Sequence, residues 1–278
     1  MSENGSVTET FPGPPDGWDP AQYRRFAAER AQPFHDLLGL CRPLPGGRAV
    51  DLGCGTGELT AELHRRLGPA ATIGLDRSAT MLAEAAGIGL AGVTFAAADI
   101  AGFGDGPEEA ATFDLVCSNA ALHWVPGDHG ATLARWRRAL RPGGQLAVQV
   151  PANADHASHR CAAELAAHEP YLSAWPGQPP PDPVAGVLRP EVYAQLLYDL
   201  GFAQQHVRLQ VYGHVLTDTA AVVEWMAGTS LTRFRAALEP ALYQRFVADY
   251  RTQLVALLGD RRPYFYAFKR ILLWGRLT

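Results

Sequence analysis

The sequence predicts an α/β fold in which helices cover both faces of a parallel β-sheet. Between residues 48 and 150, short apolar segments alternate with amphipathic helical segments, which gives five successive strands. Such an alternation implies right-handed βαβ units, and these units form a parallel sheet. Two later apolar segments, 206–216 and 264–277, enclose a mostly helical stretch. We expect these helices to cap the sheet edge at which ligands bind in open α/β folds.

The strands of the first half are expected at residues 48–55, 71–76, 93–100, 113–120 and 145–150. The helices between them are expected at residues 57–67, 78–86 and 131–140. Ser78 is a suitable N-cap for the second of these helices. The turn-forming sequence Arg141-Pro142-Gly143-Gly144 should end the third helix, at 131–140. Apolar residues at helical spacing predict a further helical region over 18–40, with a break or a new start at Pro33.

The second half is expected to be mainly helical between its two strands. A helix is expected over 189–201, because Pro190 stands near its start and Gly201 follows its end. Residues 218–259 also have a helical pattern. Residues 1–17 are polar and rich in glycine and proline, which predicts a flexible N-terminal tail.

Composition and charge argue against several classes of protein. The 278 residues carry a formal charge of −4, which argues against a nucleic-acid-binding protein. The four cysteines lie far apart without a C-x-x-C pair, so neither a zinc site nor a disulfide framework is expected. No apolar run is long enough to span a membrane, and the N-terminus lacks the features of a secretory signal. We therefore expect a cytoplasmic protein with no metal and with no membrane or nucleic-acid partner; the sequence does not indicate an oligomeric state.

The strongest local motif is the sequence Val50-Asp51-Leu52-Gly53-Cys54-Gly55-Thr56-Gly57, in which an apolar strand runs through three glycines into a helix. Glycines let the backbone approach a ligand closely, and the start of the helix offers free N–H groups. The third glycine comes one residue too early for a dinucleotide motif. Asp51 would repel a pyrophosphate but suits an ammonium group, and Asp76 can accept both hydrogen bonds of a ribose diol. The pattern favours a ligand with a ribose and a cationic amino-acid part over NAD.

At this point the chain resembles the class I S-adenosylmethionine-dependent methyltransferases. The glycine motif matches their first motif nearly letter for letter, and Asp76 matches their ribose-binding acid. Asp99 and Ile100 match the pair that reads the adenine, although Asp99 could instead cap the segment after it. The resemblance implies S-adenosyl-L-methionine as cofactor and S-adenosyl-L-homocysteine as product. The cofactor-binding residues that we expect are Tyr23, Asp51, Gly53, Gly55, Gly57, Asp76, Arg77, Asp99, Ile100 and Asn119.

A more specific resemblance covers nearly the whole chain from Trp18. The opening Trp18-Asp19-Pro20 with Tyr23, the segments 118–126 and 147–153, and the segments 212–214 and 223–225 are similar to the trans-aconitate methyltransferases. That family methylates a carboxylate of a small polycarboxylic acid on a Rossmann-like sheet of seven strands with a helical cap. The resemblance implies a single methyltransferase domain at 18–278, with acceptor-covering insertions at about 151–187 and 217–263. It also implies that the two last strands pair in antiparallel fashion.

The acceptor is expected to be a small anionic molecule. Residues 201–278 hold ten basic and five acidic residues, and every basic one except Lys269 is arginine. Arginine binds carboxylates in bidentate fashion. The candidates in this part of the chain are Arg233, Arg235, Arg261, Arg262 and Arg270. The resemblance points to Arg270 and also to Arg30, which could instead hold the carboxylate of the cofactor.

Two further acceptor-site candidates follow the fourth strand, where acceptors lie in open α/β sheets. They are His123 and Trp124. His123 could donate a hydrogen bond to the acceptor, act as a base, or only pack. The expected catalytic residues are thus His123, Trp124, Arg30 and Arg270. The chain departs from the family pattern at Gln32 and in the short aromatic segment 260–269, both of which belong to the expected acceptor site.

Three functions remain open at this stage. The first is carboxylate O-methylation like that of the trans-aconitate methyltransferases. The second is methylation of carbon, oxygen or nitrogen of another anionic small molecule in specialised metabolism, such as an isoprenyl diphosphate. The third is a non-catalytic S-adenosylmethionine-binding module, against which the intact glycine motif and Asp76 argue.

Overall fold

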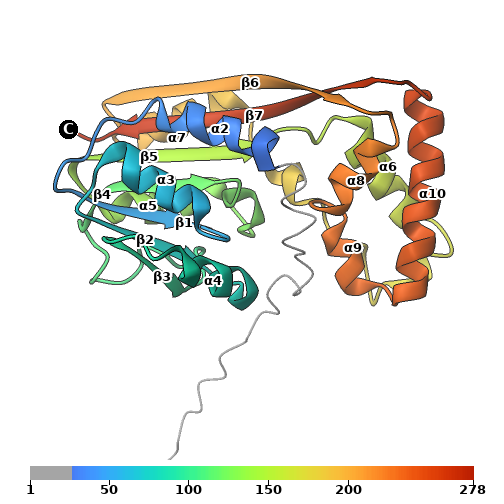
Figure 1. Cartoon of the computed structure of the whole chain (residues 1–278), viewed down its shortest axis with the longest axis horizontal. Coiled ribbons are helices and arrows are strands. Elements are labelled where there is room, and N and C mark those ends of the chain that lie inside the picture. Colours follow the sequence, from blue (N-terminus) through green and yellow to red (C-terminus); the bar gives the residue numbers. More distant parts are fainter. Residues whose placement is uncertain (1–26) are drawn as a thin grey trace, which may run out of the picture.

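The computed structural model describes residues 27–278, with side chains from residue 31 onward. Their seven strands form one sheet in the order β3-β2-β1-β4-β5-β7-β6 (Figure 1). The strands are β1 (Arg48–Leu52), β2 (Ala71–Asp76), β3 (Val93–Ala97), β4 (Phe113–Asn119), β5 (Leu140–Pro151), β6 (Gln204–Leu216) and β7 (Tyr264–Arg276). β1 to β5 are parallel, and β7 runs antiparallel to its neighbours β5 and β6. The predicted sheet and the antiparallel pairing of its two last strands are confirmed, whereas the predicted tail at 1–17 lies outside the described residues.

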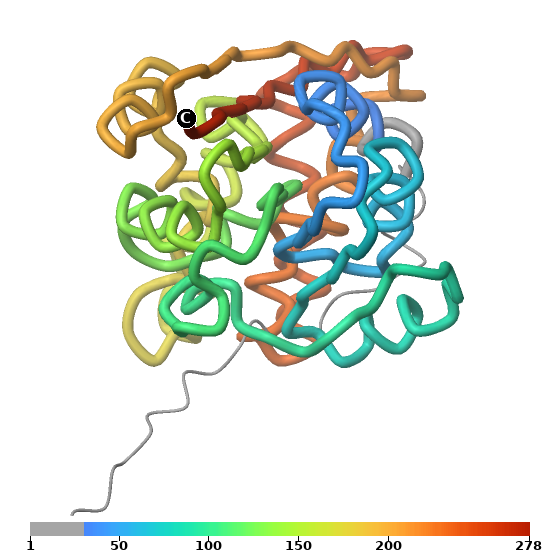
Figure 2. The backbone as a smooth tube through the Cα atoms, turned by 90° about the vertical axis from the view of Figure 1, so that its left-hand side faces the viewer, coloured from blue at the N-terminus to red at the C-terminus, as the bar shows by residue number. Residues whose placement is uncertain are grey.

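Helices cover both faces of the sheet, as Figure 2 shows. On one face lie α2 (Ala27–Leu38) and α3 (Glu58–Leu67), whose apolar side chains pack against β4, β5 and β7. On the other face lie α5 (His129–Arg138) and α7 (Pro190–Asp199). The short helix α4 (Ala79–Ala85) contacts β2 and β3, and the Ser78 hydroxyl caps it by accepting a hydrogen bond from the Met81 N–H, as predicted.

The two last strands extend beyond the rest of the sheet. β6 and β7 pair along their full length, from Gln204 opposite Arg276 to Leu216 opposite Tyr264. β5, in contrast, pairs with β7 only as far as Pro151 opposite Arg270. The first part of β7 therefore forms a two-stranded arm with β6, which reaches toward the helices on the right of Figure 1.

These helices form a cap with a hydrophobic core of its own. The cap contains α6 (Ala157–Ala166), α8 (Ala221–Ala227), α9 (Thr232–Ala237) and α10 (Pro240–Leu258). Alternate residues of the arm, Tyr264, Tyr266 and Phe268, are buried in this core together with Trp225. Since side chains on a strand alternate between its two faces, one face of the arm packs into the cap. None of the described helices, α10 included, is long and apolar enough to cross a membrane.

Two expectations about helix ends were wrong. Pro33 neither breaks nor restarts the first helix but lies inside α2, where the fully buried side chains of Phe34 and Leu37 anchor the following turn. The sequence Arg141-Pro142-Gly143-Gly144 does not end a helix either, because α5 already ends at Arg138 and β5 begins at Leu140. The register between β4 and β5 shifts at this point, and Gly143 has a φ of +75°, so the four residues form an irregular stretch of strand.

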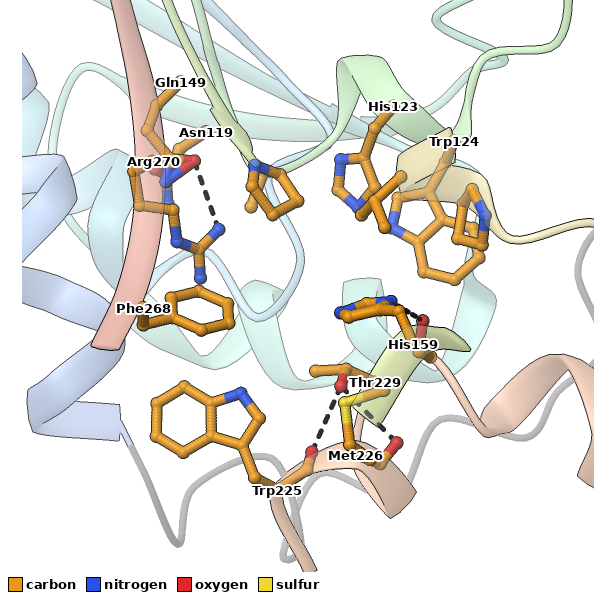
Figure 3. A pocket seen from close by; sticks show the side chains of 15 residues that line it. Asn119, His123, Trp124, Gln149, His159, Trp225, Met226, Thr229, Phe268 and Arg270 are labelled. Carbon is orange, nitrogen blue, oxygen red and sulfur yellow. Dashed lines mark hydrogen bonds between the residues drawn. The ribbon is translucent and has the colours of Figure 1, made fainter. Parts of the chain in front are cut away.

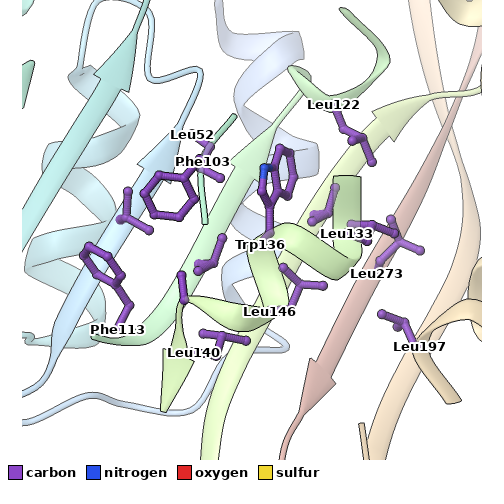
Figure 4. Close-up of a cluster of buried hydrophobic side chains, with 14 of the residues drawn as sticks. Leu52, Phe103, Phe113, Leu122, Leu133, Trp136, Leu140, Leu146, Leu197 and Leu273 are labelled. Atoms are coloured by element: carbon purple, nitrogen blue, oxygen red, sulfur yellow. The ribbon is translucent and has the colours of Figure 1, made fainter. Parts of the chain in front are cut away.

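The helix α5 is anchored by Trp136, which lies in the core shown in Figure 4. Its side chain is fully buried, and its indole N–H donates a hydrogen bond of 3.0 Å to the Ile100 carbonyl.

We expect Trp136→Ala to lower the free energy of unfolding by about 3–5 kcal/mol, because it leaves a cavity and an unpaired carbonyl. Urea denaturation measures the change, with Tyr198→Ala as control, since Tyr198 is 70 % exposed. A loss below about 1 kcal/mol for Trp136→Ala would contradict this description of the core.

Candidate active site

The residues predicted to bind ligands lie along one edge of the sheet, where the parallel strands end. Asp51 and Gly53 stand at the end of β1, Asp76 ends β2, and Asn119 ends β4. The carboxyl ends of parallel strands meet at this edge, which is the usual ligand edge of open α/β sheets. The fold therefore brings these four residues together, as the sequence predicts.

The glycine loop has a shape that larger residues cannot adopt. Gly53 has a φ of +78°, and a Cβ atom there would lie 2.3 Å from the Cβ of Ala121. Gly57 has a φ of +77°, and a Cβ atom there would meet the Phe95 ring at 2.5 Å. Both the backbone conformation and the close packing thus require glycine. At Gly55, in contrast, no atom of the described residues lies within 4 Å of an added Cβ, so their packing leaves this part of the loop open.

Asp76 holds the loop from the neighbouring strand. One carboxylate oxygen accepts a hydrogen bond of 2.8 Å from the Gly55 N–H, and the other accepts one of 2.9 Å from the Ser78 N–H. Each carboxylate oxygen can accept more than one hydrogen bond, so Asp76 keeps the capacity to bind further hydroxyl groups. Arg77 lies near enough to Asp76 and Asp99 to interact with both of their charges, so these three residues lie near one another.

Asp51 lies behind the glycine loop with an incomplete set of hydrogen bonds. One of its carboxylate oxygens accepts a hydrogen bond of 2.6 Å from the Thr60 hydroxyl. Its other oxygen, Oδ1, is buried and lacks a partner among the described residues, and the same holds for the side-chain oxygen of Asn119. Burial raises the pKa of Asp51 to about 6, with a smaller contribution from the charge of Asp76. Two buried acceptor atoms near the strand ends suit a ligand that carries an ammonium group.

Asp99 and Ile100 have local structural roles in addition to the predicted one. Asp99 is exposed, and its carboxylate accepts a hydrogen bond of 2.9 Å from the Ala101 N–H, so it does cap the turn that follows β3. Ile100 is partly buried against the main core, and its side chain lies 3.8 Å from where a Cβ of Gly53 would be. The pair is therefore held beside the glycine loop, whatever ligand it contacts.

A pocket of about 700 Å³, including the space open to solvent, lies between the sheet edge and the cap. Figure 3 shows its walls. The sheet contributes the ends of β4 and β5 and part of β7, and the cap contributes α6, α8 and the turn after α8. The principal side chains are those of Asn119, His123, Trp124, Gln149, His159, Trp225, Met226, Thr229, Ser230, Phe268 and Arg270.

Arg270 provides a buried positive charge on the sheet side of this pocket. Its side chain is only 6 % exposed, and the guanidinium lies 4.3 Å from the centre of the Phe268 ring. One guanidinium nitrogen donates a long hydrogen bond of 3.4 Å to the Gln149 side-chain oxygen. The guanidinium thus packs on an aromatic ring and donates to a neutral amide. A buried cation in such surroundings is suited to an anionic ligand.

His123 lies in the same pocket, in the short helix η2 (Leu122–Trp124). Its ring is 8 % exposed and packs 5.2 Å from the ring of Trp124. Burial lowers the pKa of His123 to about 3, and the positive charge of Arg270 contributes. The imidazole is therefore neutral at physiological pH, and it is a very weak base.

Comparisons with known proteins assign the chain to a family. Residues 49–144 match the family described as a methyltransferase domain. A trans-aconitate 2-methyltransferase of Deinococcus radiodurans is 43 % identical over 92 % of this chain and 96 % of its own length. One of Streptomyces avermitilis is 38 % identical over 94 % of this chain and 97 % of its own length. The chain belongs to the trans-aconitate methyltransferase family. It is accordingly an S-adenosylmethionine-dependent methyltransferase, as the resemblance implied.

Solved structures show the same fold for this family member. A phosphoethanolamine N-methyltransferase of Haemonchus contortus in complex with S-adenosyl-L-methionine superposes with a TM-score of 0.52 at 18 % identity. The match covers 89 % of this chain and 52 % of that protein. At this identity the likeness concerns the fold alone, which is the class I methyltransferase fold.

Two residues predicted for the site of this methyltransferase are not described, and three other candidates lie away from the pocket. Tyr23 lies outside the described residues, and so does the side chain of Arg30, whose backbone lies in the first turn of α2. Arg235, Arg261 and Arg262 are exposed and do not line the pocket. The physical reason is that these three stand on outer faces and loops of the cap, where charged side chains are solvated.

Other residues of the pocket were not among those predicted for the active site. Gln149 was noted only as part of a matching segment, but it accepts the hydrogen bond of Arg270. Ala120 has a φ of +53°, an uncommon conformation for a residue with a side chain, and it lines the pocket next to Asn119. His159 and Ser230 come from the cap, far from any motif in the sequence. Only the aromatic segment before Arg270 offered a signal, since its alternating rings mark one face of a strand.

The residues around the glycine loop fit the cofactor of the family. The unpartnered oxygens of Asp51 and Asn119 would accept hydrogen bonds from its amino group, and the open space at Gly55 leaves room for the cofactor.

We predict that Asp76→Ala weakens the affinity for S-adenosylhomocysteine about ten- to a hundredfold, because the ribose hydroxyls lose a charged acceptor. Calorimetric titration measures the change, with Asp199→Ala as control, since Asp199 is exposed at the end of α7. Unchanged affinity in Asp76→Ala would rule out this placement of the ribose.

Proposed function

We propose that this methyltransferase transfers a methyl group to a carboxylate of a small polycarboxylic acid, with trans-aconitate as the first substrate to test. The observation that carries the proposal is the buried guanidinium of Arg270, which lines a pocket next to the glycine loop. The names of the relatives that are similar over nearly the whole chain support the same substrate class.

The methyl donor is S-adenosylmethionine, whose sulfonium supplies an electrophilic methyl group. In the proposed arrangement Asp51 and Asn119 hold the amino-acid part, and Asp76 accepts the hydrogen bonds of the ribose. Arg77, Asp99 and Ile100 lie on the adenine side. These residues act by fixing the donor at the strand ends, which lowers the barrier through proximity and orientation.

On the acceptor side, Arg270 would bind a carboxylate that does not react, while a second carboxylate faces the donor. A guanidinium can form two parallel hydrogen bonds with a carboxylate, which fixes the orientation of the acid as well as its position. The amide of Gln149 and the ring of Phe268 hold this guanidinium in place. Arg30, whose side chain lies outside the described residues, remains our second candidate for this role.

The proposed reaction requires no general base, because a carboxylate is already deprotonated near neutral pH. His123 would then act as a neutral imidazole that donates a hydrogen bond to the acceptor. Trp124 packs against its ring, and Trp225 and Phe268 close the opposite side of the pocket. These rings would help to exclude water from the reacting groups.

The same aromatic rings support a second candidate function. Trp124, Trp225 and Phe268 would also accommodate an anionic acceptor with an apolar chain, such as an isoprenyl diphosphate. If the methylated atom were a carbon, the pocket would have to stabilise the charge that develops on the acceptor during the reaction. A screen of acceptors with labelled methyl donor separates the two functions.

Arg270 offers the most direct test of acceptor binding. We predict that Arg270→Ala raises the KM for trans-aconitate about thirtyfold or more, which corresponds to the loss of about 2 kcal/mol or more for a buried charge pair. Arg270→Lys should recover only part of the loss, since lysine lacks the planar fork. The affinity for S-adenosylhomocysteine should stay the same, and Arg235→Ala is the exposed control. An unchanged acceptor KM in Arg270→Ala would contradict the proposal.

The pH dependence of turnover distinguishes a carboxylate acceptor from one that needs a base. The pKa of His123 is lowered to about 3, so this group stays deprotonated throughout the range from pH 6 to 8. We therefore predict that kcat at saturating trans-aconitate is nearly constant over this range. A tenfold rise in kcat per pH unit would indicate a base that must lose a proton, and it would favour the second function.

A further inference from the structure

The cap side of the pocket carries a group of polar side chains that the proposed mechanism does not use. His159 of α6 and Ser230 of the turn before α9 line the pocket. Behind them lie Asp182, which precedes the short helix η4 (Pro183–Gly186), and Arg233 of α9. The side chains of His159, Asp182 and Arg233 are 10 % exposed or less. Buried polar residues that converge from three segments of the chain need a structural or functional reason.

The geometry of this cluster fixes the proton on one nitrogen of His159. The ring nitrogen Nδ1 lies 2.7 Å from a carboxylate oxygen of Asp182, so it carries a proton and donates it in a hydrogen bond. The Ser230 hydroxyl lies 3.4 Å from the same nitrogen and donates to Asp182 at 3.3 Å. The other ring nitrogen, Nε2, points into the middle of the pocket, as Figure 3 shows.

The charges of the cluster are arranged so that one negative group is already balanced. Arg233 forms an ion pair of 3.4 Å with Asp182, and it also donates to the Ser230 carbonyl at 2.9 Å. Burial alone would raise the pKa of Asp182, but the hydrogen bond from His159 and the charge of Arg233 lower it. With Asp182 ionised and paired, the cluster is neutral when His159 is neutral and carries one positive charge when His159 is protonated.

His159 and Arg270 lie on opposite sides of the same pocket. Arg270 stands on the sheet and His159 on the cap, and His123 lines the same pocket next to Trp124. The charges of both residues act on His123. A molecule that reaches from one side to the other would therefore meet a permanent cation at one end and a titratable one at the other.

We propose that His159, held by Asp182, binds a second anionic group of the acceptor as an imidazolium and so makes the pocket selective for acids with at least two anionic groups besides the reacting one. The inference rests on the proposed function, because it concerns the same acceptor. A neutral His159 would present the lone pair of Nε2 to the pocket and repel a carboxylate, whereas the protonated ring presents an N–H donor. Binding of the acid therefore takes up a proton whenever His159 is neutral in the free enzyme.

Five charged or titratable side chains of the described residues surround His159 or face it across the pocket. They are Asp182 and Arg233 in the cluster, His156 at the N-cap of α6, His123 of η2 and, across the pocket, Arg270. The pKa of His156 is lowered to about 4 and that of His123 to about 3, both mainly by burial, so these two stay neutral near pH 7.

The test measures the binding and turnover of trans-aconitate in the full-length enzyme saturated with cofactor. We expect His159→Gln to raise the KM for trans-aconitate about ten- to a hundredfold at pH 7, since a charged hydrogen bond is lost. Affinity for S-adenosylhomocysteine should not change. Calorimetry of trans-aconitate binding to the S-adenosylhomocysteine complex, in two buffers of different ionisation enthalpy at pH 7.5, should show proton uptake in the unmodified enzyme and none in His159→Gln.

Two further variants distinguish a specific loss of acceptor binding from a general loss of folded protein. Asp182→Asn keeps the shape of the cluster but removes the charge that stabilises the imidazolium, so it should reduce proton uptake and raise KM as well. His168→Gln is the matched control, because His168 is exposed after α6 and its ring bonds only to the Glu164 carbonyl among the described residues. An unchanged KM and unchanged proton uptake in both His159→Gln and Asp182→Asn would overturn the inference.

The outcomes also separate this inference from the proposed function. Binding of trans-aconitate that depends on His159 but leads to no methylation would support the inference and contradict the proposed carboxylate methylation. Methylation with a KM that does not depend on His159 would support the proposed function and overturn the inference. Absence of both binding and methylation would overturn both.

Discussion

The antiparallel pairing of β7 with β5 is the constraint on which the acceptor pocket depends. The pairing ends where Pro151 meets Arg270, at the ligand edge of the sheet. Before this point β7 continues with β6 alone, and its inward side chains belong to the core of the cap. One strand therefore joins the sheet to the cap and carries Arg270 at the junction. A shift of the register by one residue would turn Arg270 away from the pocket and the aromatic rings away from the cap core.

The two parts of the active site are built in different ways. The donor side depends on a continuous loop, in which glycines and the carboxylate of Asp76 shape the backbone. The acceptor side consists of single side chains from β7, η2, α6 and α8, which only the packing of the cap brings together. The shape of the donor side therefore follows from local backbone geometry, whereas the shape of the acceptor pocket follows from the packing of the cap on the sheet.

This difference explains what the sequence could predict. The strands, their order along the chain and the residues around the glycine loop follow local patterns, such as alternating apolar segments and glycines at fixed spacing. Arg270 was found through a resemblance, and its partner Gln149 lies 121 positions earlier in the sequence. His159 and Asp182 carry no motif, because their contact depends on how α6 packs against the loop before α7. Pro33 was misjudged because tertiary packing outweighs the local preference of proline in α2.

The identity of the methylated product tests the central claim most directly. The enzyme is incubated with trans-aconitate and S-adenosylmethionine that carries a labelled methyl group, and the product is analysed by mass spectrometry before and after mild alkali. A carboxylate acceptor predicts a single monomethyl ester, from which alkali releases the label as methanol. Label that stays in the product after alkali, or transfer only to acceptors without a carboxylate, would contradict the account.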